Sequence, residues 1–202
     1  HAHAQRARMD SLQAALNRQP TENLVRAYTL AALAKTCSTI DPKRAFVLSR
    51  QAVALAQKLK SDEALADAWV SQRWAYYYLG EYGVCDSVNQ LAAAATKRSG
   101  DPRSWALTYG APHYISSMAD TTARKRFERS LHIADSLGDR ALAAEILYWN
   151  GIQRYAGGTA AMLEQAIAFY RSVGDSSGVA MCLFTLEDFE PYASDRELKQ
   201  RN

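Results

Sequence analysis

Aromatic side chains that also carry a polar group are crowded into three stretches of this 202-residue chain, at residues 69–82, 105–114 and 148–155. In the first stretch Tyr76, Tyr77 and Tyr78 are consecutive. Successive residues of a helix point about 100° apart, so at least one of these three rings should face outwards. Rings with a hydroxyl or an indole N–H are typical of surfaces that bind peptides. The chemistry that these stretches indicate is therefore recognition.

The candidate peptide-binding residues are Trp74, Tyr77, Tyr148, Arg73, Arg154 and Asn150. We expect the three aromatic residues to form the floor of a groove, with the polar residues at its edge. A guanidinium group there could hold a carboxylate through two parallel hydrogen bonds. Two alternatives stay open: the aromatic rings pack in the core, and the polar side chains pair locally or face solvent.

Motifs for catalysis and for metal binding are absent from the sequence, which has no HExxH, Walker loop, GxGxxG, paired-carboxylate motif or Ser/His/Asp order. The cysteines Cys37, Cys85 and Cys182 form no CxxC and have no histidine at ligand spacing. We expect them to be small buried hydrophobic residues, with a single disulfide left open. The sequence therefore predicts no enzyme activity, no cofactor and no metal site.

Charge and hydropathy limit the partners. The net charge is only +3 and no basic run is present, so a nucleic acid is a poor candidate. No apolar run approaches the roughly 20 residues needed to span a bilayer. The expected partner is a protein or peptide, with a homodimer left open.

The N-terminus suggests export. Ala2-His3-Ala4 resembles the end of a secretory signal peptide, although residues 1–8 could equally be a cloning remnant. A periplasmic or otherwise exported protein is expected, and a cytoplasmic one is the alternative.

The elements that must position the candidate residues are helices in a repeat. Ser61-Asp62, Gly100-Asp101, Gly138-Asp139 and Gly174-Asp175 place their aspartates 39, 38 and 36 residues apart. Glycine closes one helix in the left-handed conformation and aspartate caps the next, so each dipeptide is read as a junction between helices. The sequence predicts one all-α domain over residues 1–202, with about ten helices in five hairpins and a flexible tail at 194–202.

Several helix boundaries can be predicted. We expect an opening helix over Met9–Leu16, a second helix capped by Thr21, and a third that begins at Pro42 after the cap Asp41. A helix over Arg103–Met118 should be kinked by Pro112.

The central stretch, residues 66–102, resembles a tetratricopeptide repeat. Trp69, Tyr76, Gly80, Tyr82 and Ala92 fall where that family places its bulky and small residues. Arg73 stands where the family prefers glycine, and Cys85 where it prefers alanine, so the repeats are degenerate. The resemblance implies a right-handed superhelical solenoid whose first helices line a concave, peptide-binding groove.

A narrower resemblance covers residues 9–139. Asp10–Gln13, Asp41–Ala45 and Ser136–Asp139 are similar to the N-terminal repeat region of bacterial membrane-bound sensor histidine kinases. That resemblance implies the alternative function, an extracytoplasmic sensory or dimerisation domain of a two-component system.

Overall fold

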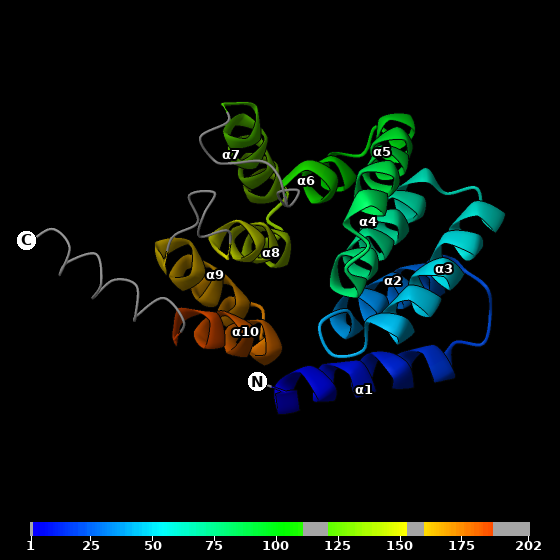
Figure 1. The fold of residues 1–202 in the computed structure, drawn as a ribbon, viewed down its shortest axis with the longest axis horizontal. Coiled ribbons are helices and arrows are strands. Elements are labelled where there is room, and N and C mark those ends of the chain that lie inside the picture. Colours follow the sequence, from blue (N-terminus) through cyan, green and yellow to red (C-terminus); the bar gives the residue numbers. More distant parts are fainter. Residues whose placement is uncertain (1, 111–120, 153–159, 188–202) are drawn as a thin grey trace, which may run out of the picture. The chain divides into compact units, whose positions relative to one another are not determined.

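The computed structural model describes residues 2–110, 121–152 and 160–187, and the regular structure in these ranges is entirely α-helical (Figure 1). The chain divides into two compact units, Ala2–Thr108 and the part that begins at Tyr109, whereas the length predicts one domain. We call them the N-terminal and the C-terminal unit. The prediction of an all-α chain is confirmed.

The helices of the N-terminal unit are α1 (Ala2–Arg18), α2 (Leu24–Cys37), α3 (Pro42–Lys58), α4 (Asp62–Leu79) and α5 (Tyr82–Ser99). The division between the units falls inside α6 (Pro102–Gly110). The helices of the C-terminal unit are α7 (Thr121–Ser136), α8 (Arg140–Gly151), α9 (Ala160–Ser172) and α10 (Ser176–Glu187).

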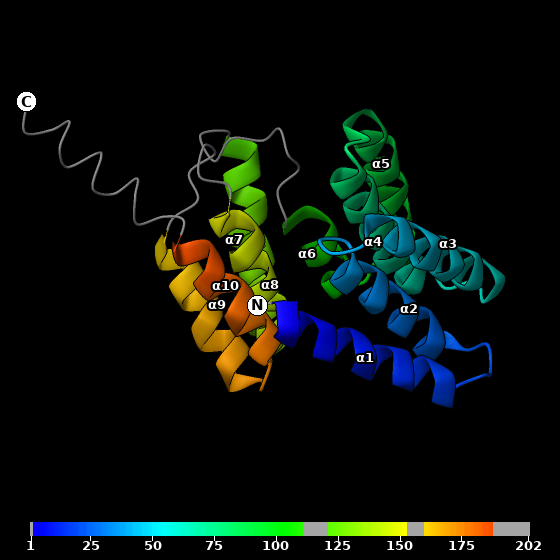
Figure 2. The same cartoon turned by 60° about the horizontal axis from the view of Figure 1, so that its bottom comes forward.

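Each helix packs mainly on its neighbours in sequence. In the N-terminal unit α4 contacts α3 and α5, and α2 contacts α3 and also α4, the next helix but one (Figure 2). In the C-terminal unit α8 contacts α7 and α9, and α9 contacts α10. Antiparallel pairs stacked in this way are helical hairpins, so the predicted helical-repeat architecture is confirmed within each unit.

Three of the four helix junctions have the expected aspartate cap, and the first is capped one residue earlier than expected. Asp101, Asp139 and Asp175 cap α6, α8 and α10, with oxygens accepting a backbone N–H three residues on at 2.6, 2.9 and 3.0 Å. At the first junction Ser61 is the cap of α4, not Asp62, and the left-handed residue before it is Lys60 at φ 55°. The caps therefore stand at 61, 101, 139 and 175, spaced 40, 38 and 36 residues apart.

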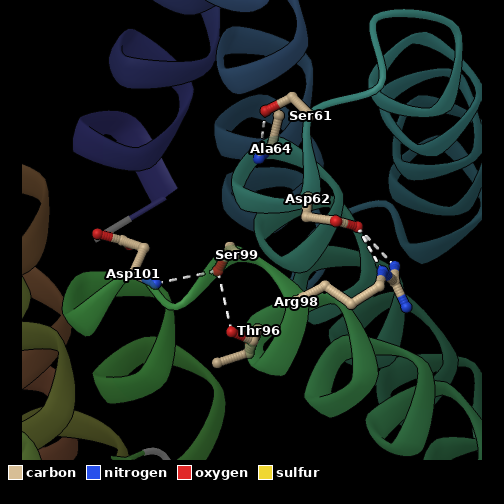
Figure 3. Close-up of polar contacts among 7 residues, drawn as sticks. All are labelled: Ser61, Asp62, Ala64, Thr96, Arg98, Ser99 and Asp101. Carbon is tan, nitrogen blue, oxygen red and sulfur yellow. Dashed lines mark hydrogen bonds and ion pairs between the residues drawn. The ribbon is translucent and has the colours of Figure 1, made fainter.

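An ion pair closes the hairpin of α4 and α5 (Figure 3). The Arg98 guanidinium in the last turn of α5 donates to Asp62 Oδ1 at the start of α4 through Nε (2.9 Å) and Nη2 (2.6 Å). Lys58 in the last turn of α3 pairs with Glu22, just before α2, in the same way. Each pair sets a base at a helix C-terminus and an acid near an N-terminus, where the helix dipoles favour them.

Some helix boundaries differ from those expected. α1 begins at Ala2, well before Met9. Asn23, not Thr21, caps α2, because its side-chain oxygen accepts the Arg26 N–H at 2.9 Å. α6 ends at Gly110, and Pro112 and the tail 194–202 lie outside the described residues.

Ala92 and Ala166 are completely buried in the second helices α5 and α9, as the repeat pattern predicts. We expect Ala92→Phe to lower the free energy of unfolding by about 1–3 kcal/mol, because the added ring overpacks a helix crossing. Leu91→Phe is the matched control, since Leu91 on the same helix is 46% exposed. Urea unfolding measures both, and an equal, small effect of the two changes would show that the hairpin crossing is misplaced.

None of the helices within the described ranges has both the length and the hydropathy needed to cross a bilayer.

Candidate functional site

The site begins with α4, which carries three of the six candidate residues. Ser61 Oγ accepts the Ala64 N–H at 3.2 Å and so starts the helix. Gly80 ends it at φ 81°, a left-handed conformation that costs glycine little. The last turns of α4 hold the three consecutive tyrosines, and Tyr82 follows at the start of α5.

Arg73 and Trp74 lie inside the unit and not on its surface, with 3% and 4% of their surface exposed. The guanidinium carbon of Arg73 lies 5.1 Å from the centre of the Trp74 ring, a cation–π distance. Arg73 Nη1 donates to Asn89 Oδ1 of α5 at 2.7 Å. Arg73 therefore links α4 to α5, and Trp74 packs against both Arg73 and the neighbouring Tyr77.

The burial has a simple geometric cause. The six successive residues 70–75 of α4 are all buried, and at 100° per residue they cover the whole circumference of the helix. Residues 146–151 of α8 are buried in the same way. α4 is therefore enclosed at mid-length and α8 over its last six residues, whereas the expected groove needs one open side.

The expectation that Trp74, Arg73, Tyr148 and Asn150 face an open groove is therefore corrected, since all four are buried. Arg154 lies outside the described residues. Among the six candidates, Tyr77 is the described residue that reaches the surface, where it is half-buried. The peptide-binding role itself stays a prediction.

Around Tyr77 the aromatic rings form a continuous set, which we call the tyrosine cluster: Tyr77, Tyr78 and Tyr82. The centre of the Tyr77 ring lies 5.2 Å from that of Tyr78 and 5.5 Å from that of Tyr82, both edge to face. It also lies 5.7 Å from the ring of buried Trp74. Tyr82, at the start of α5, is 48% exposed, so the cluster runs from the core to the surface.

Tyr148 and Asn150 belong to the C-terminal unit. The Tyr148 ring packs edge to face on Trp149 at 5.0 Å, and its hydroxyl lies near Thr185 of α10. Burial raises the pKa of Tyr148 to about 12, although the neighbouring Thr185 hydroxyl lowers it. These contacts place Tyr148 between α8 and α10 as a packing residue.

Two buried polar side chains join alternate helices, a role that the sequence analysis missed. Asn150 Nδ2 donates to the carbonyls of Gly110 in α6 and of Ile146 in its own helix, both at 2.7 Å. Ser71 Oγ in α4 donates to the carbonyl of Ala31 in α2 at 2.9 Å. Both inter-helix bonds span 40 residues, close to the repeat length, and that shared spacing is the signal that could have identified them.

The cysteines behave as small hydrophobic residues. Cys37, Cys85 and Cys182 are free and buried, and burial raises the pKa of each thiol. In the described part of the chain, no group of three His, Cys, Asp or Glu side chains could hold a metal ion.

No protein-family model matches the chain, and a search of curated proteins finds no match.

Proposed function

We propose that the chain is a non-catalytic helical-repeat scaffold that binds a peptide or protein segment, with the tyrosine cluster as its contact surface. The carrying observation is that Tyr82 keeps 48% of its surface exposed while its ring contacts Tyr77. An exposed aromatic ring held by its neighbours has little conformational freedom to lose when a ligand binds.

The support beneath the cluster favours the same proposal. Tyr77 contacts Trp74, which lies against the Arg73 guanidinium, and Arg73 is in turn bonded to Asn89. This chain of contacts fixes the rings before a ligand arrives. Tyrosine also offers a hydroxyl for a hydrogen bond to a peptide backbone, which is why it is enriched in binding surfaces.

The resemblance to tetratricopeptide repeats supports a peptide or protein as the ligand, and export to the periplasm is part of the same proposal. The sensory or dimerisation function in a two-component system stays a prediction from the sequence.

Peptide selection tests the proposal. Random-sequence peptides are selected on the immobilised wild-type protein, and the dissociation constant of the best one is measured by fluorescence anisotropy. Tyr82→Ala should raise that constant about thirtyfold, because an exposed aromatic anchor contributes about 2 kcal/mol or more. Leu91→Ala is the control, since Leu91 is similarly exposed on the same helix but outside the cluster. Failure to enrich any peptide, or equal affinity of the two variants, would refute the proposal.

A further inference from the structure

Helix α3 carries positive charges and no negative ones. Between Asp41 and Asp62 the chain has no Asp or Glu, and its basic residues there are Lys43, Arg44, Arg50, Lys58 and Lys60. They are not consecutive, so a search for a basic run in the sequence does not find them. Asp41 itself is engaged as the cap of α3, where its carboxylate accepts the Arg44 N–H at 3.0 Å. α3 therefore contributes positive charge to the surface of the N-terminal unit.

Two of these bases lie on one exposed side of α3 with a valine between them, and we call this set the α3 outer face: Lys43, Val47 and Arg50. The three residues are four and three positions apart, so their side chains share one face of the helix. All three are exposed, Val47 by 54%. The α3 outer face thus presents an apolar side chain between two cations.

Arg50 is positioned by an aromatic ring. Its guanidinium carbon lies 5.9 Å from the centre of the Phe46 ring, and that ring packs edge to face on Tyr76 of α4 at 5.1 Å. A guanidinium group over a ring keeps its N–H donors for a further partner, and its planar fork matches a carboxylate. Because the contact with Phe46 limits where the group can lie, Arg50 has less freedom to lose on binding than a fully mobile side chain.

The acids of the N-terminal unit leave the α3 outer face positive. Lys58, at the end of α3, pairs with Glu22, and Arg44 donates to Gln13 Oε1 at 2.8 Å. Among the residues that the structure describes, none forms an ion pair with Lys43 or Arg50. Two positive charges therefore remain beside Val47.

We propose that the α3 outer face binds an acidic helix of another protein, which places carboxylates on Lys43 and Arg50 and an apolar side chain on Val47. Lys43 and Arg50 are seven residues apart, about 10.5 Å along the axis of α3. Two carboxylates seven residues apart on a partner helix have the same separation, so both ion pairs can form at once. The α3 outer face shares no residue with the tyrosine cluster, so this proposal and the proposed function can fail independently.

The charge and the exposed valine together favour this partner. A neutral or basic surface would cover two cations without supplying counter-charges, which is costly. A lipid surface is not favoured, because a helix that lies in a membrane inserts a wide apolar face, and the apolar side of α3 is buried in the core. A nucleic acid would meet the two cations with phosphates, but phosphates supply no apolar contact for Val47.

Fluorescence anisotropy with the full chain tests the proposal. The probe is a fluorescein-labelled helical peptide of about 20 residues, rich in alanine and glutamine, with two glutamates seven residues apart and a leucine between them. We expect saturable binding to the wild type below about 1 mM at low salt, and weaker binding as the salt concentration rises. Without saturable binding of this peptide, the proposal is overturned.

Charge reversal locates the binding face. Arg50→Glu should raise the dissociation constant of the acidic peptide at least about tenfold, because attraction becomes repulsion. Lys97→Glu is the matched control, since it makes the same change of charge at an exposed residue of α5 in the same unit, and it should leave the constant unchanged. An equal effect of the two variants would mean that only the net charge matters, which also overturns the proposal.

Exchanging the charges checks the pairing. The double variant Lys43→Glu/Arg50→Glu should bind a peptide with lysine in place of both glutamates at least about ten times more tightly than the wild type does. No such gain would contradict the pairing. Oligothymidylate and phosphatidylserine vesicles should bind the wild type more weakly than the acidic peptide does. Tighter binding of either, lost in Arg50→Glu, would show that the partner is not a protein helix.

Discussion

Trp74→Ala should lower the free energy of unfolding by about 3–5 kcal/mol, the range for truncating a large aromatic side chain in a core. The Trp74 ring is 4% exposed and lies against the Arg73 guanidinium and the Tyr77 ring. Removing the ring leaves a cavity, and the buried Arg73 guanidinium loses its cation–π contact. Urea unfolding followed by circular dichroism measures the loss.

Tyr82→Ala is the control for Trp74→Ala, because Tyr82 belongs to the same ring set but is 48% exposed. We expect its loss of unfolding free energy to stay within about 1 kcal/mol, as for substitutions away from the core. If Trp74→Ala lowered the free energy of unfolding no more than Tyr82→Ala does, the Trp74 ring would lie at the surface. The groove expected from the sequence would then fit the data better.

Tyr148→Ala should cost a similar amount, about 3–5 kcal/mol, in the C-terminal unit. Tyr148 is 8% exposed, packs on Trp149 and has its hydroxyl near Thr185, so the change removes an apolar contact within α8 and the ring that lies against α10. Thermal and urea unfolding of the variant measure the effect.

Tyr148→Phe separates the two parts of this loss. It keeps the ring and removes only the hydroxyl, so we expect a loss of no more than about 1 kcal/mol, the usual net contribution of one hydrogen bond. Equal losses for Tyr148→Phe and Tyr148→Ala would mean that the ring packs against little, contrary to its burial.

The fold could be predicted from the sequence because local signals repeat. Asp101, Asp139 and Asp175 each follow a glycine with φ between 64° and 71° and cap the next helix. A Gly-Asp dipeptide ends one helix and caps the next through local bonds, so its position can be predicted without knowing the rest of the fold. At the first junction, where serine stands in place of glycine, the cap is Ser61 and not the predicted Asp62, because the left-handed residue is Lys60, one position earlier.

The exposed side of α4 could not be predicted in the same way. Crowded aromatic residues in α4 predict an outward-facing ring, but the same crowding is also compatible with a helix enclosed on all sides. Residues 70–75 include Ser71, Gln72 and Arg73, which look like surface residues in sequence, and yet all are buried. Their environment depends on bonds to other helices, such as that from Ser71 to Ala31, which helical periodicity does not encode.

Fluorine NMR of the protein labelled with 3-fluorotyrosine tests the proposed binding surface most directly. A peptide selected on the wild-type protein is titrated in, and the tyrosine signals are assigned by single Tyr→Phe changes. We predict that the resonances of Tyr77, Tyr78 and Tyr82 shift with the peptide while that of buried Tyr148 does not. Shifts confined to Tyr148, or saturating binding that leaves the tyrosine cluster unmoved, would contradict the account.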